Sequence, residues 1–300
     1  MANRDGFSAY HPIVNFIYFG LVLVFSMFIM NPISLAVSLG ASLCYAVYLN
    51  GRKAVRFLLL GILPMMAAAA FINPAFSHEG LTILTYLPSG NPLTLESIIY
   101  GFAASAMLAS VVVWFSCYNA VITSDKFIYL FGRIIPSLSL VLSMTLRFIP
   151  RFRAQIKVVS QAQKCISRDG SEGFISKIKN AITVLSIMVT WSLENAIETA
   201  DSMKSRGYGL SGRTAFSIYT FRKRDVYALV WLLAGGAYIF YGWLSRGIYW
   251  RYYPTVKWTG LTPLAVSVQL VYLLLCLTPV VINLAEDCRW KRYAGGLGSK

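Results

Sequence analysis

The sequence predicts an all-α, polytopic membrane protein with about six transmembrane helices and two long cytoplasmic helices. Of its 300 residues, 57% are hydrophobic and only 13% are charged, whereas an ordinary soluble domain is about one quarter charged. Several uncharged runs reach the ~20 residues that a helix needs to cross a bilayer. The basic residues behind the net charge of +15 gather mostly in one central region, which indicates a cytoplasmic segment between two membrane parts.

Four apolar runs precede the central region, and they are residues 12–30, 32–50, 55–76 and 97–123. Asn31-Pro32 separates the first run from the second, because proline cannot continue helical hydrogen bonding and restricts the residue before it. We therefore expect a tight helical hairpin there. Residues 78–92, which are rich in proline and glycine, are predicted to form a loop.

Two further apolar runs, residues 226–245 and 261–285, follow the central region, and Pro279 is expected to interrupt the second. The chain is therefore predicted to have three parts. They are N-terminal transmembrane helices over residues 1–122, a cytoplasmic helical region over residues 123–224, and C-terminal transmembrane helices over residues 225–300.

The basic residues predict the orientation of these spans in the cell membrane. Residues 123–226 hold 16 of the 27 lysines and arginines, and none occurs between Phe57 and Asp125. Because Lys and Arg are retained on the cytoplasmic side, the loop at residues 78–92 is predicted outside, and both termini are predicted to be cytoplasmic.

The loop between the last two spans departs from this pattern. It is predicted to lie outside, yet it holds three basic residues, Arg246, Arg251 and Lys257. It also holds five aromatic residues, Tyr249, Trp250, Tyr252, Tyr253 and Trp258. Aromatic rings of this kind are enriched at membrane–water interfaces, so we interpret them as an interfacial belt.

An apolar stripe in the central region predicts a long amphipathic helix. Nine apolar residues recur at steps of three or four, the period of one helix face. The longest uncharged run inside this helix, residues 180–193, is too short to cross a bilayer. We therefore predict a rod of roughly 45 Å at or below the cytoplasmic membrane face. The stripe consists of Ile175, Ile178, Ile182, Leu185, Val189, Leu193, Ala196, Ala200 and Met203.

A companion helix is predicted over residues 137–170, apolar at first and basic afterwards, with a bend at Pro150. The two helices end alike, in Ser167-Arg168-Asp169-Gly170 and in Ser205-Arg206-Gly207. A terminal cation and a glycine are also an ordinary way to cap a helix C-terminus, which explains any single end of this kind. Two such ends on adjacent helices favour contacts with a partner, because a guanidinium forms fork-like bonds with carboxylates.

At these ends the sequence resembles a known family. "LRFIPRFRAQIKVVSQAQKCISRDG" and "ENAIETADSMKSRGYGLSGRT" are similar to the two coupling-helix motifs of the transmembrane T component of energy-coupling factor transporters, the family that includes the cobalt-transport permease. The resemblance implies that a small-Arg-small triplet at each end contacts one subunit of an ATPase dimer. These contact residues are Ser167, Arg168, Asp169, Ser205, Arg206 and Gly207. Asp169 departs from the family's small residue, so the second motif is the stronger match.

The resemblance implies a non-catalytic scaffold that works with an ATPase dimer and a small substrate-binding membrane subunit, for uptake of a vitamin or a metal ion. The residues agree with this role. The proposed spans carry no acidic, basic or histidine residue near their midpoints, which argues against an ion-coupled site. The sequence contains no GxxxxGK[ST] pattern, so the ATPase must be a separate chain.

Charged residues on the two long helices suggest a contact between them. Glu194, Glu198 and Asp201 form an acidic row beside the apolar stripe. If the helices cross, this row is expected to pair with Arg147, Arg151 or Arg153 of the companion helix.

Neither a metal site nor a cofactor is predicted. The five cysteines contain no CxxC pair, and the two histidines, His11 and His78, lie far apart in the sequence. Three alternatives remain open: a lipid-modifying membrane enzyme, a conventional ABC importer permease, and a basic anchor for nucleic acid or anionic lipid. The enzyme would need clustered Asp or His for its chemistry, and the regular apolar stripe favours a protein contact over nucleic acid.

Overall fold

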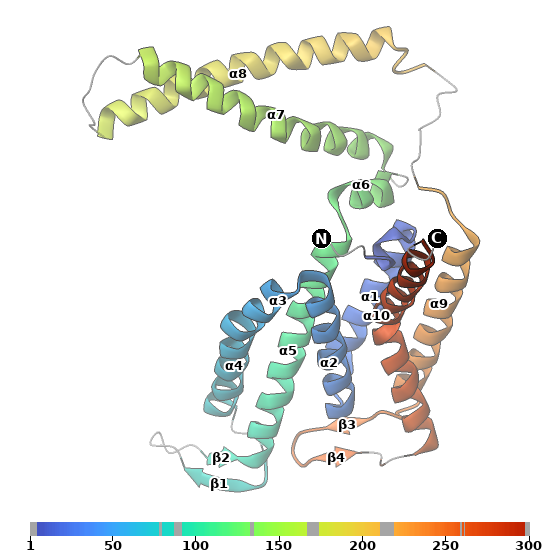
Figure 1. The fold of residues 1–300 in the computed structure, drawn as a ribbon. Helices are drawn as coiled ribbons and strands as arrows, with labels where there is room; N and C mark the ends of the chain where they lie inside the picture. The colour runs from blue at the N-terminus through green and yellow to red at the C-terminus, as the bar shows by residue number, and fades with distance from the viewer. Residues whose placement is uncertain are drawn as a thin grey trace. The chain divides into compact units, whose positions relative to one another are not determined.

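The computed structural model describes residues 5–77, 80–86, 92–132, 135–166, 174–210, 219–258, 260 and 262–297. The chain divides into two compact units. The membrane unit comprises Met1–Phe127 and Tyr219–Lys300, and the second unit comprises Ile128–Ile218. Helices dominate both units, which confirms the predicted all-α, polytopic class (Figure 1).

The helical elements, in chain order, are η1 (Phe7–Ala9), α1 (Pro12–Phe28), α2 (Pro32–Asn50), α3 (Arg52–Phe57), η2 (Leu58–Ile62), α4 (Leu63–Phe76), α5 (Leu95–Val121), α6 (Ser124–Gly132), α7 (Pro136–Ile166), α8 (Phe174–Ser205), α9 (Lys223–Leu244) and α10 (Pro263–Leu297). The strands are β1 (Ile83–Tyr86), β2 (Pro92–Thr94), β3 (Trp250–Arg251) and β4 (Lys257–Trp258).

Within the described residues, five helices are long and apolar enough to cross a membrane. The remaining predicted span, the first along the chain, forms α1, which is a shorter apolar helix of 17 residues. At 1.5 Å per residue it is about 25 Å long, a few Å less than the ~30 Å hydrocarbon core of a bilayer. It is shorter than the apolar run at residues 12–30 because the backbone leaves the helical conformation at Ile29.

The turn between α1 and α2 confirms the predicted helical hairpin. The Asn31 side chain accepts a hydrogen bond from the backbone N–H of Ile33 at 3.0 Å, and Pro32 occupies the first turn of α2. An asparagine cap followed by proline is a favourable helix start, because the cap binds an otherwise unpaired N–H and proline has none to lose.

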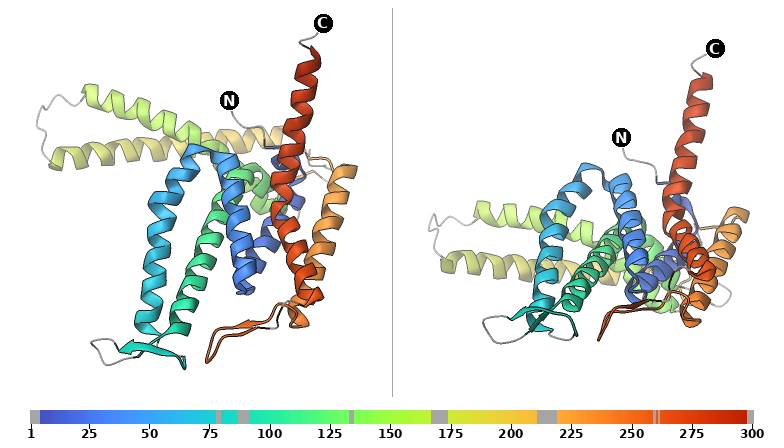
Figure 2. Two further views of the ribbon diagram at one scale, coloured as in Figure 1. Left: turned by 60° about the horizontal axis from the view of Figure 1, so that its bottom comes forward. Right: turned by 90° about the horizontal axis from the view of Figure 1, so that it is seen from below.

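The helices of the membrane unit form a bundle in which α2 packs between α5 and α10 (Figures 1 and 2). On one side, α4 packs against α5; on the other, α9 packs against α10. Gly101 of α5 lies so close to α4 that a side-chain Cβ would meet the Ala70 carbonyl oxygen at 2.9 Å. Only 6% of the span Arg52–Phe76 is buried in the chain, against 28–39% for the other four long spans, so α4 is the outlying helix.

An aromatic core and a polar network hold this bundle together. Trp114, Tyr18 and Tyr272 are fully buried and come from three different helices. Ser38 of α2 lies at the centre of the polar network: its Oγ is 2.6 Å from the Oγ of Ser110, and it accepts a hydrogen bond from Trp114 Nε1 at 3.0 Å. Such bonds between helices satisfy groups that lipid cannot.

Several helices contain proline residues within their length. The run at residues 55–76 is one continuous helical segment, with a π-helical turn, η2, just before Pro64. In this wider turn the Leu63 N–H donates to the Leu58 carbonyl, five residues earlier. Helix α10 continues through Pro279, so the predicted interruption is wrong. Helix α7 also continues through Pro150, and the bend predicted there stays a prediction.

Two antiparallel hairpins stand where the sequence predicts loops. Strand β1 pairs with β2, and β3 pairs with β4 with Trp250 opposite Trp258 and Arg251 opposite Lys257. Both hairpins lie at the same end of the membrane unit (Figure 1). Aromatic and β-branched residues at these positions favour the extended backbone.

Candidate functional site at the ends of α7 and α8

Helices α7 and α8 of the second unit run in opposite directions and pack against each other. The Phe152 and Trp191 rings meet edge to face, with centroids 5.4 Å apart. Met188 of α8 is 4% exposed, and it lines a groove of about 450 Å³ together with Phe152 and Ile156 of α7. These residues form the contact between the two helices.

Part of the apolar stripe predicted for α8 borders this contact, because Leu185, Val189 and Leu193 line the same groove, yet most of the stripe stays exposed. Leu185 is 64% exposed and Leu193 is 62% exposed, although both are large apolar residues. Ile178, Ile182 and Val189 of the stripe are exposed as well. Exposed apolar rows of this length are unusual on a protein that works alone, so the stripe indicates a surface that lipid or another chain covers.

The end of α8 is closed by its own backbone. Gly207 adopts the left-handed conformation, with φ of 78°. The N–H of Tyr208 donates to the Met203 carbonyl at 3.0 Å, and the N–H of Gly207 donates to the Lys204 carbonyl at 2.9 Å. This pair of bonds is the Schellman motif, which satisfies the last carbonyls of a helix without a side chain.

Arg206 is therefore not needed to cap its own helix. Its side chain is exposed, and in the part of the chain that the structure describes it forms no hydrogen bond or ion pair. The Ser205 hydroxyl, by contrast, bonds to its own helix, because it donates to the Ser202 carbonyl at 2.9 Å. The Arg206 guanidinium is therefore exposed at the C-terminus of α8, where the helix dipole places partial negative charge.

The predicted residues of the first motif, Ser167, Arg168 and Asp169, lie outside the described residues. The structure therefore describes one of the two predicted ends. Their role as ATPase contacts stays a prediction.

The predicted pairing between the helices is not made in this structure. Arg147, Arg151, Glu194 and Glu198 are all exposed, and no ion pair joins them within the described residues. The Phe152–Trp191 ring contact nevertheless places neighbours of these residues together, because Arg151 precedes Phe152 and Glu194 follows Trp191 by one helical turn. The pairing stays a prediction.

The sequence did not reveal that an N-terminal segment binds both the chain leaving the membrane unit, at α6, and the chain returning to it, at the start of α9. Lys126 of α6 is 6% exposed. Its Nζ donates to the Ser8 carbonyl and hydroxyl at 2.7 Å each and to the Val121 carbonyl at 2.9 Å. Burial lowers the pKa of Lys126, and the Asp5 carboxylate opposes that shift. A single lysine just beyond an apolar run was the only sequence signal.

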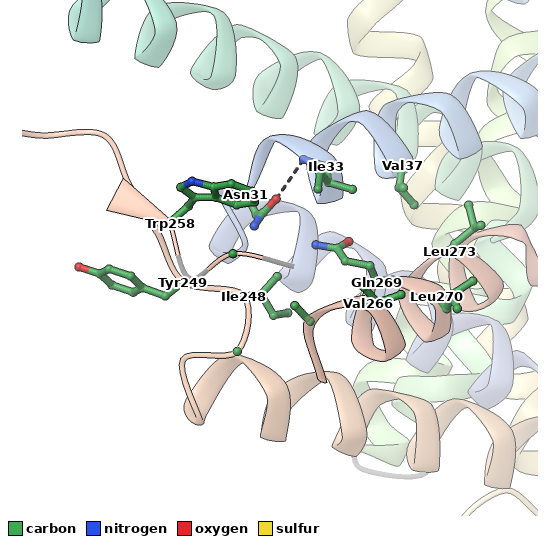
Figure 3. Close-up of a pocket in the computed structure, with 13 residues that line it drawn as sticks. Asn31, Ile33, Val37, Ile248, Tyr249, Trp258, Val266, Gln269, Leu270 and Leu273 are labelled. Carbon is green, nitrogen blue, oxygen red and sulfur yellow. Dashed lines mark hydrogen bonds between the residues drawn. The ribbon is translucent and has the colours of Figure 1, made fainter. Parts of the chain in front are cut away.

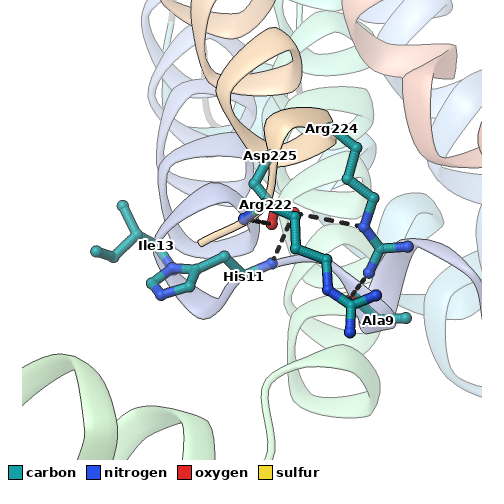
Figure 4. A network of polar contacts seen from close by, with 6 residues as sticks. All are labelled: Ala9, His11, Ile13, Arg222, Arg224 and Asp225. Carbon is teal, nitrogen blue, oxygen red and sulfur yellow. Dashed lines mark hydrogen bonds and ion pairs between the residues drawn. The ribbon is translucent and has the colours of Figure 1, made fainter. Parts of the chain in front are cut away.

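The returning chain, at the start of α9, is fastened to the same N-terminal segment (Figure 4). Asp225 accepts hydrogen bonds from the backbone N–H groups of His11 at 3.2 Å and Arg222 at 2.9 Å. Arg224 donates to the Ala9 carbonyl at 2.6 Å, and its guanidinium lies over the Tyr10 ring at 4.8 Å. We call residues 5–11 the N-terminal anchor, because they bind both Lys126 and the start of α9.

His11 closes the N-terminal anchor by capping α1. Its Nδ1 accepts a hydrogen bond from the Ile13 N–H at 3.3 Å, and its ring lies 4.8 Å from the Phe221 ring. Burial lowers the pKa of His11, and the nearby Asp225 carboxylate partly offsets the effect. The neutral imidazole is therefore the favoured form.

Comparison with known proteins agrees with this arrangement. The family model CbiQ, described as a cobalt transport protein, matches residues 8–216. The energy-coupling factor transporter transmembrane protein EcfT of Lacticaseibacillus paracasei is 26% identical over 246 residues, which cover 77% of this chain and 89% of that protein.

Two further relatives of the same name match over shorter segments. The protein from Streptococcus thermophilus is 33% identical over 106 residues, and the one from Lactobacillus helveticus is 34% identical over 110 residues. Each match covers 35% of this chain and 40% of the relative, so the chain spans less than half of their length in these matches. Because the family model covers more than half of the sequence, the chain belongs to the CbiQ family of cobalt transport proteins, as its helix-end motifs predicted.

Proposed function

We propose that the chain is the non-catalytic transmembrane scaffold of an energy-coupling factor importer. In this role α7 and α8 carry the movement of a dimer of ATP-binding subunits to a small substrate-binding membrane subunit, which takes up a vitamin or a metal ion. The three relatives are named as transmembrane proteins of such transporters. The proposal places residues 123–224 and both termini on the cytoplasmic side, where the basic residues concentrate.

The exposed Arg206 at the closed end of α8 is the observation that carries the proposal. A helix end that satisfies its carbonyls through Gly207 leaves the arginine for a partner. A guanidinium on a rigid rod transmits displacement better than one on a loop, because the helix holds its geometry. We extend the same role to Arg168 at the end of the first long helix, on the basis of its matching motif.

The exposed stripe of α8 supports the proposed contact with the substrate-binding membrane subunit. Leu185 and Leu193 stay more than 60% exposed although they border the groove beside α7, and Ile182 is exposed outside it. A moving apolar rod beneath the membrane can push on a hydrophobic partner only if the two remain in contact, and burial of apolar surface supplies that adhesion at about 25 cal/mol per Å².

The proposal is tested by reversing the charge at the end of α8. The chain is co-expressed with the ATP-binding subunits of its own organism, and the complex is purified through a tag on the chain. We expect R206E to reduce recovery of the ATP-binding subunits at least tenfold, because a lost charge-assisted contact and a new like-charge contact together exceed ~1.4 kcal/mol.

K204E is the matched control, since Lys204 is an exposed cation two residues away on the same turn. It changes the net charge equally but alters no residue of the triplet. Equal recovery of the ATP-binding subunits with R206E and with the unaltered chain would contradict the proposal. Equal losses with R206E and K204E would show that general charge, and not Arg206, holds the complex.

A further inference from the structure

The end of the membrane unit that carries the β3–β4 hairpin contains an apolar pocket of about 290 Å³ (Figure 3). Tyr249 and Trp258 line it on the hairpin side, and Val37, Leu270 and Leu273 line it toward the helices. The volume is about ten times the ~30 Å³ share of one water molecule. It lies near the lower limit of sites that hold small molecules.

The two side-chain amides in the pocket wall, those of Asn31 and Gln269, are engaged with their own chain. Asn31 accepts the capping bond of α2, and Gln269 Nε2 donates to the Ser34 hydroxyl at 2.7 Å. The Ser34 hydroxyl in turn donates to the Gln269 carbonyl oxygen at 3.1 Å. With these amides engaged, the remaining surface of the pocket is almost wholly apolar. Such a pocket accepts a hydrocarbon chain and does not favour a polar metabolite.

Positive charge gathers beside this pocket. Arg251 and Lys257 face each other across the hairpin, and both are exposed. Like charges directly opposite on paired strands repel. The sequence from Ser245 to Thr262 contains three basic residues and no acidic residue. Within the described residues no carboxylate forms an ion pair with either cation.

The hairpin joins the charge to the pocket. Trp258, which lines the pocket, directly follows Lys257 in β4 and pairs with Trp250 of β3. The Trp250 and Trp258 rings lie 5.9 Å apart. Aromatic residues of this kind belong at the level of lipid headgroups. Successive strand residues point to opposite faces, so the Arg251–Lys257 pair lies on the face of the hairpin opposite the Trp250–Trp258 pair. An anion held at Arg251 and Lys257 would sit at headgroup depth, and its hydrocarbon tail would reach the pocket past the edge of the short hairpin.

We propose that this end of the membrane unit binds a lipid with an anionic headgroup. One acyl chain occupies the pocket, and the headgroup phosphate is held by Arg251 and Lys257. The bound anion removes the repulsion across the hairpin. The proposal also explains why these cations stand in a loop that the charge distribution of the rest of the chain assigns to the outer side. It does not depend on the transport role.

Native mass spectrometry of the full chain tests this proposal. The purified chain is titrated in detergent with phosphatidylglycerol and, separately, with phosphatidylcholine of the same acyl chains. We expect the chain to prefer the anionic lipid by at least tenfold in apparent dissociation constant. Each cation near a lipid surface contributes about a fivefold preference, so R251Q/K257Q should bring the two lipids to nearly equal affinity.

Charge-matched variants separate this site from general attraction. K53Q/R56Q removes two exposed cations at the opposite end of the helices and should keep the preference. R251K/K257R conserves the charge and should also keep it. Equal affinity of the unaltered chain for both lipids would overturn the proposal, as would an equal loss in K53Q/R56Q and R251Q/K257Q.

Two tryptophan variants test the pocket itself. L270W fills it, whereas L274W adds the same bulk one turn along α10, at a leucine that does not line it. The two leucines are similarly exposed, at 54% and 50%. We expect L270W to weaken phosphatidylglycerol binding at least fivefold and L274W to leave it unchanged. Unchanged binding in L270W would overturn the assignment of the acyl chain to this pocket.

Discussion

His11 is stabilised in its neutral form by two features of its surroundings. Its Nδ1 accepts a hydrogen bond from the Ile13 N–H, which a protonated Nδ1 cannot do. Burial also lowers its pKa, against the opposing effect of Asp225. In the unfolded chain the imidazole is free to take up a proton at its ordinary pKa of about 6.5.

This difference predicts an acid-sensitive N-terminal anchor. Below about pH 6.5 the unfolded state binds more protons at His11 than the folded state does, so stability falls as the pH falls. Above that pH the contribution of His11 is constant. We expect the thermal midpoint in detergent to drop more between pH 7.5 and pH 5.5 for the unaltered chain than for H11N, since asparagine caps a helix without titrating. An equal drop in both proteins would contradict this role of His11.

At the scale of single residues, the sequence was most informative where the physics is local. The end of α8 was predicted at Arg206 and Gly207, because a helix C-terminus favours a left-handed residue and Gly207 supplies it. Lys126 and Ser8 were missed because their bond joins residues 118 positions apart. No periodicity or motif signals such a contact.

Helix α8 has one face beside the groove that it forms with α7 and another face outside it. Met188, Leu185 and Leu193 line the groove, and the Trp191 ring contacts Phe152 of α7. Ile178 and Ile182 of the stripe are exposed and do not line the groove. The stripe therefore belongs only partly to the α7–α8 contact, and the rest of it is open to a different surface.

A pair of alanine variants distinguishes the two faces. M188A removes a buried side chain and should destabilise the α7–α8 contact by about 2–4 kcal/mol, through lost burial and a cavity. I182A, on the exposed part of the stripe outside the groove, should cost less than about 0.5 kcal/mol in the isolated chain. Hydrogen exchange of α7 and α8 in the full chain measures both. Equal loss of protection in the two variants would show that the stripe also packs within the chain.

Among the elements, long helices were predictable and short strands were not. The three-and-four spacing predicted α8 to end at about the residue where it does, because a helix repeats its pattern over many turns. The hairpins β1–β2 and β3–β4 contain strands of two to four residues. Segments so short carry no period, and their structure depends on the partner strand and on packing against the helix ends.

At the scale of the molecule, the N-terminal anchor binds both chain segments that lead between the two units. Lys126 fastens the outgoing segment to Ser8, and Asp225 and Arg224 fasten the returning one to His11 and Ala9. A force on either segment is therefore applied first to one short piece of chain. For a scaffold that transmits movement, such a fixed point prevents the motion from being absorbed by slack connections.

Removing the anchor cation should weaken stability and coupling together. K126M leaves the Ser8 and Val121 carbonyls without their buried donor, which should cost about 2–4 kcal/mol. In the assembled transporter we expect ATP hydrolysis to continue while substrate uptake falls severalfold, measured in the same proteoliposomes. K223M, which removes an exposed cation near the start of α9, is the control and should leave both rates unchanged. Normal uptake by K126M would contradict the fixed-point role.

Much of the whole architecture followed from hydropathy, because the bilayer imposes helix length and lipid rewards uncharged runs. The order of helices in the bundle did not follow. It depends on contacts such as Ser38 with Ser110 and Trp114, and serines inside apolar runs look alike in sequence. The first span was predicted too long for a related reason, since apolar Ile29 belongs to the turn and not to the helix.

The uncovered stripe of α8 has a consequence for the life of the chain in the cell. Newly made copies that have not bound a partner subunit expose this apolar surface, which chaperones and membrane proteases recognise. Orphan copies should therefore be degraded quickly, and those in complete assemblies should persist. The abundance of the finished machine would then be set by its scarcest component, with no need for matched synthesis of the rest.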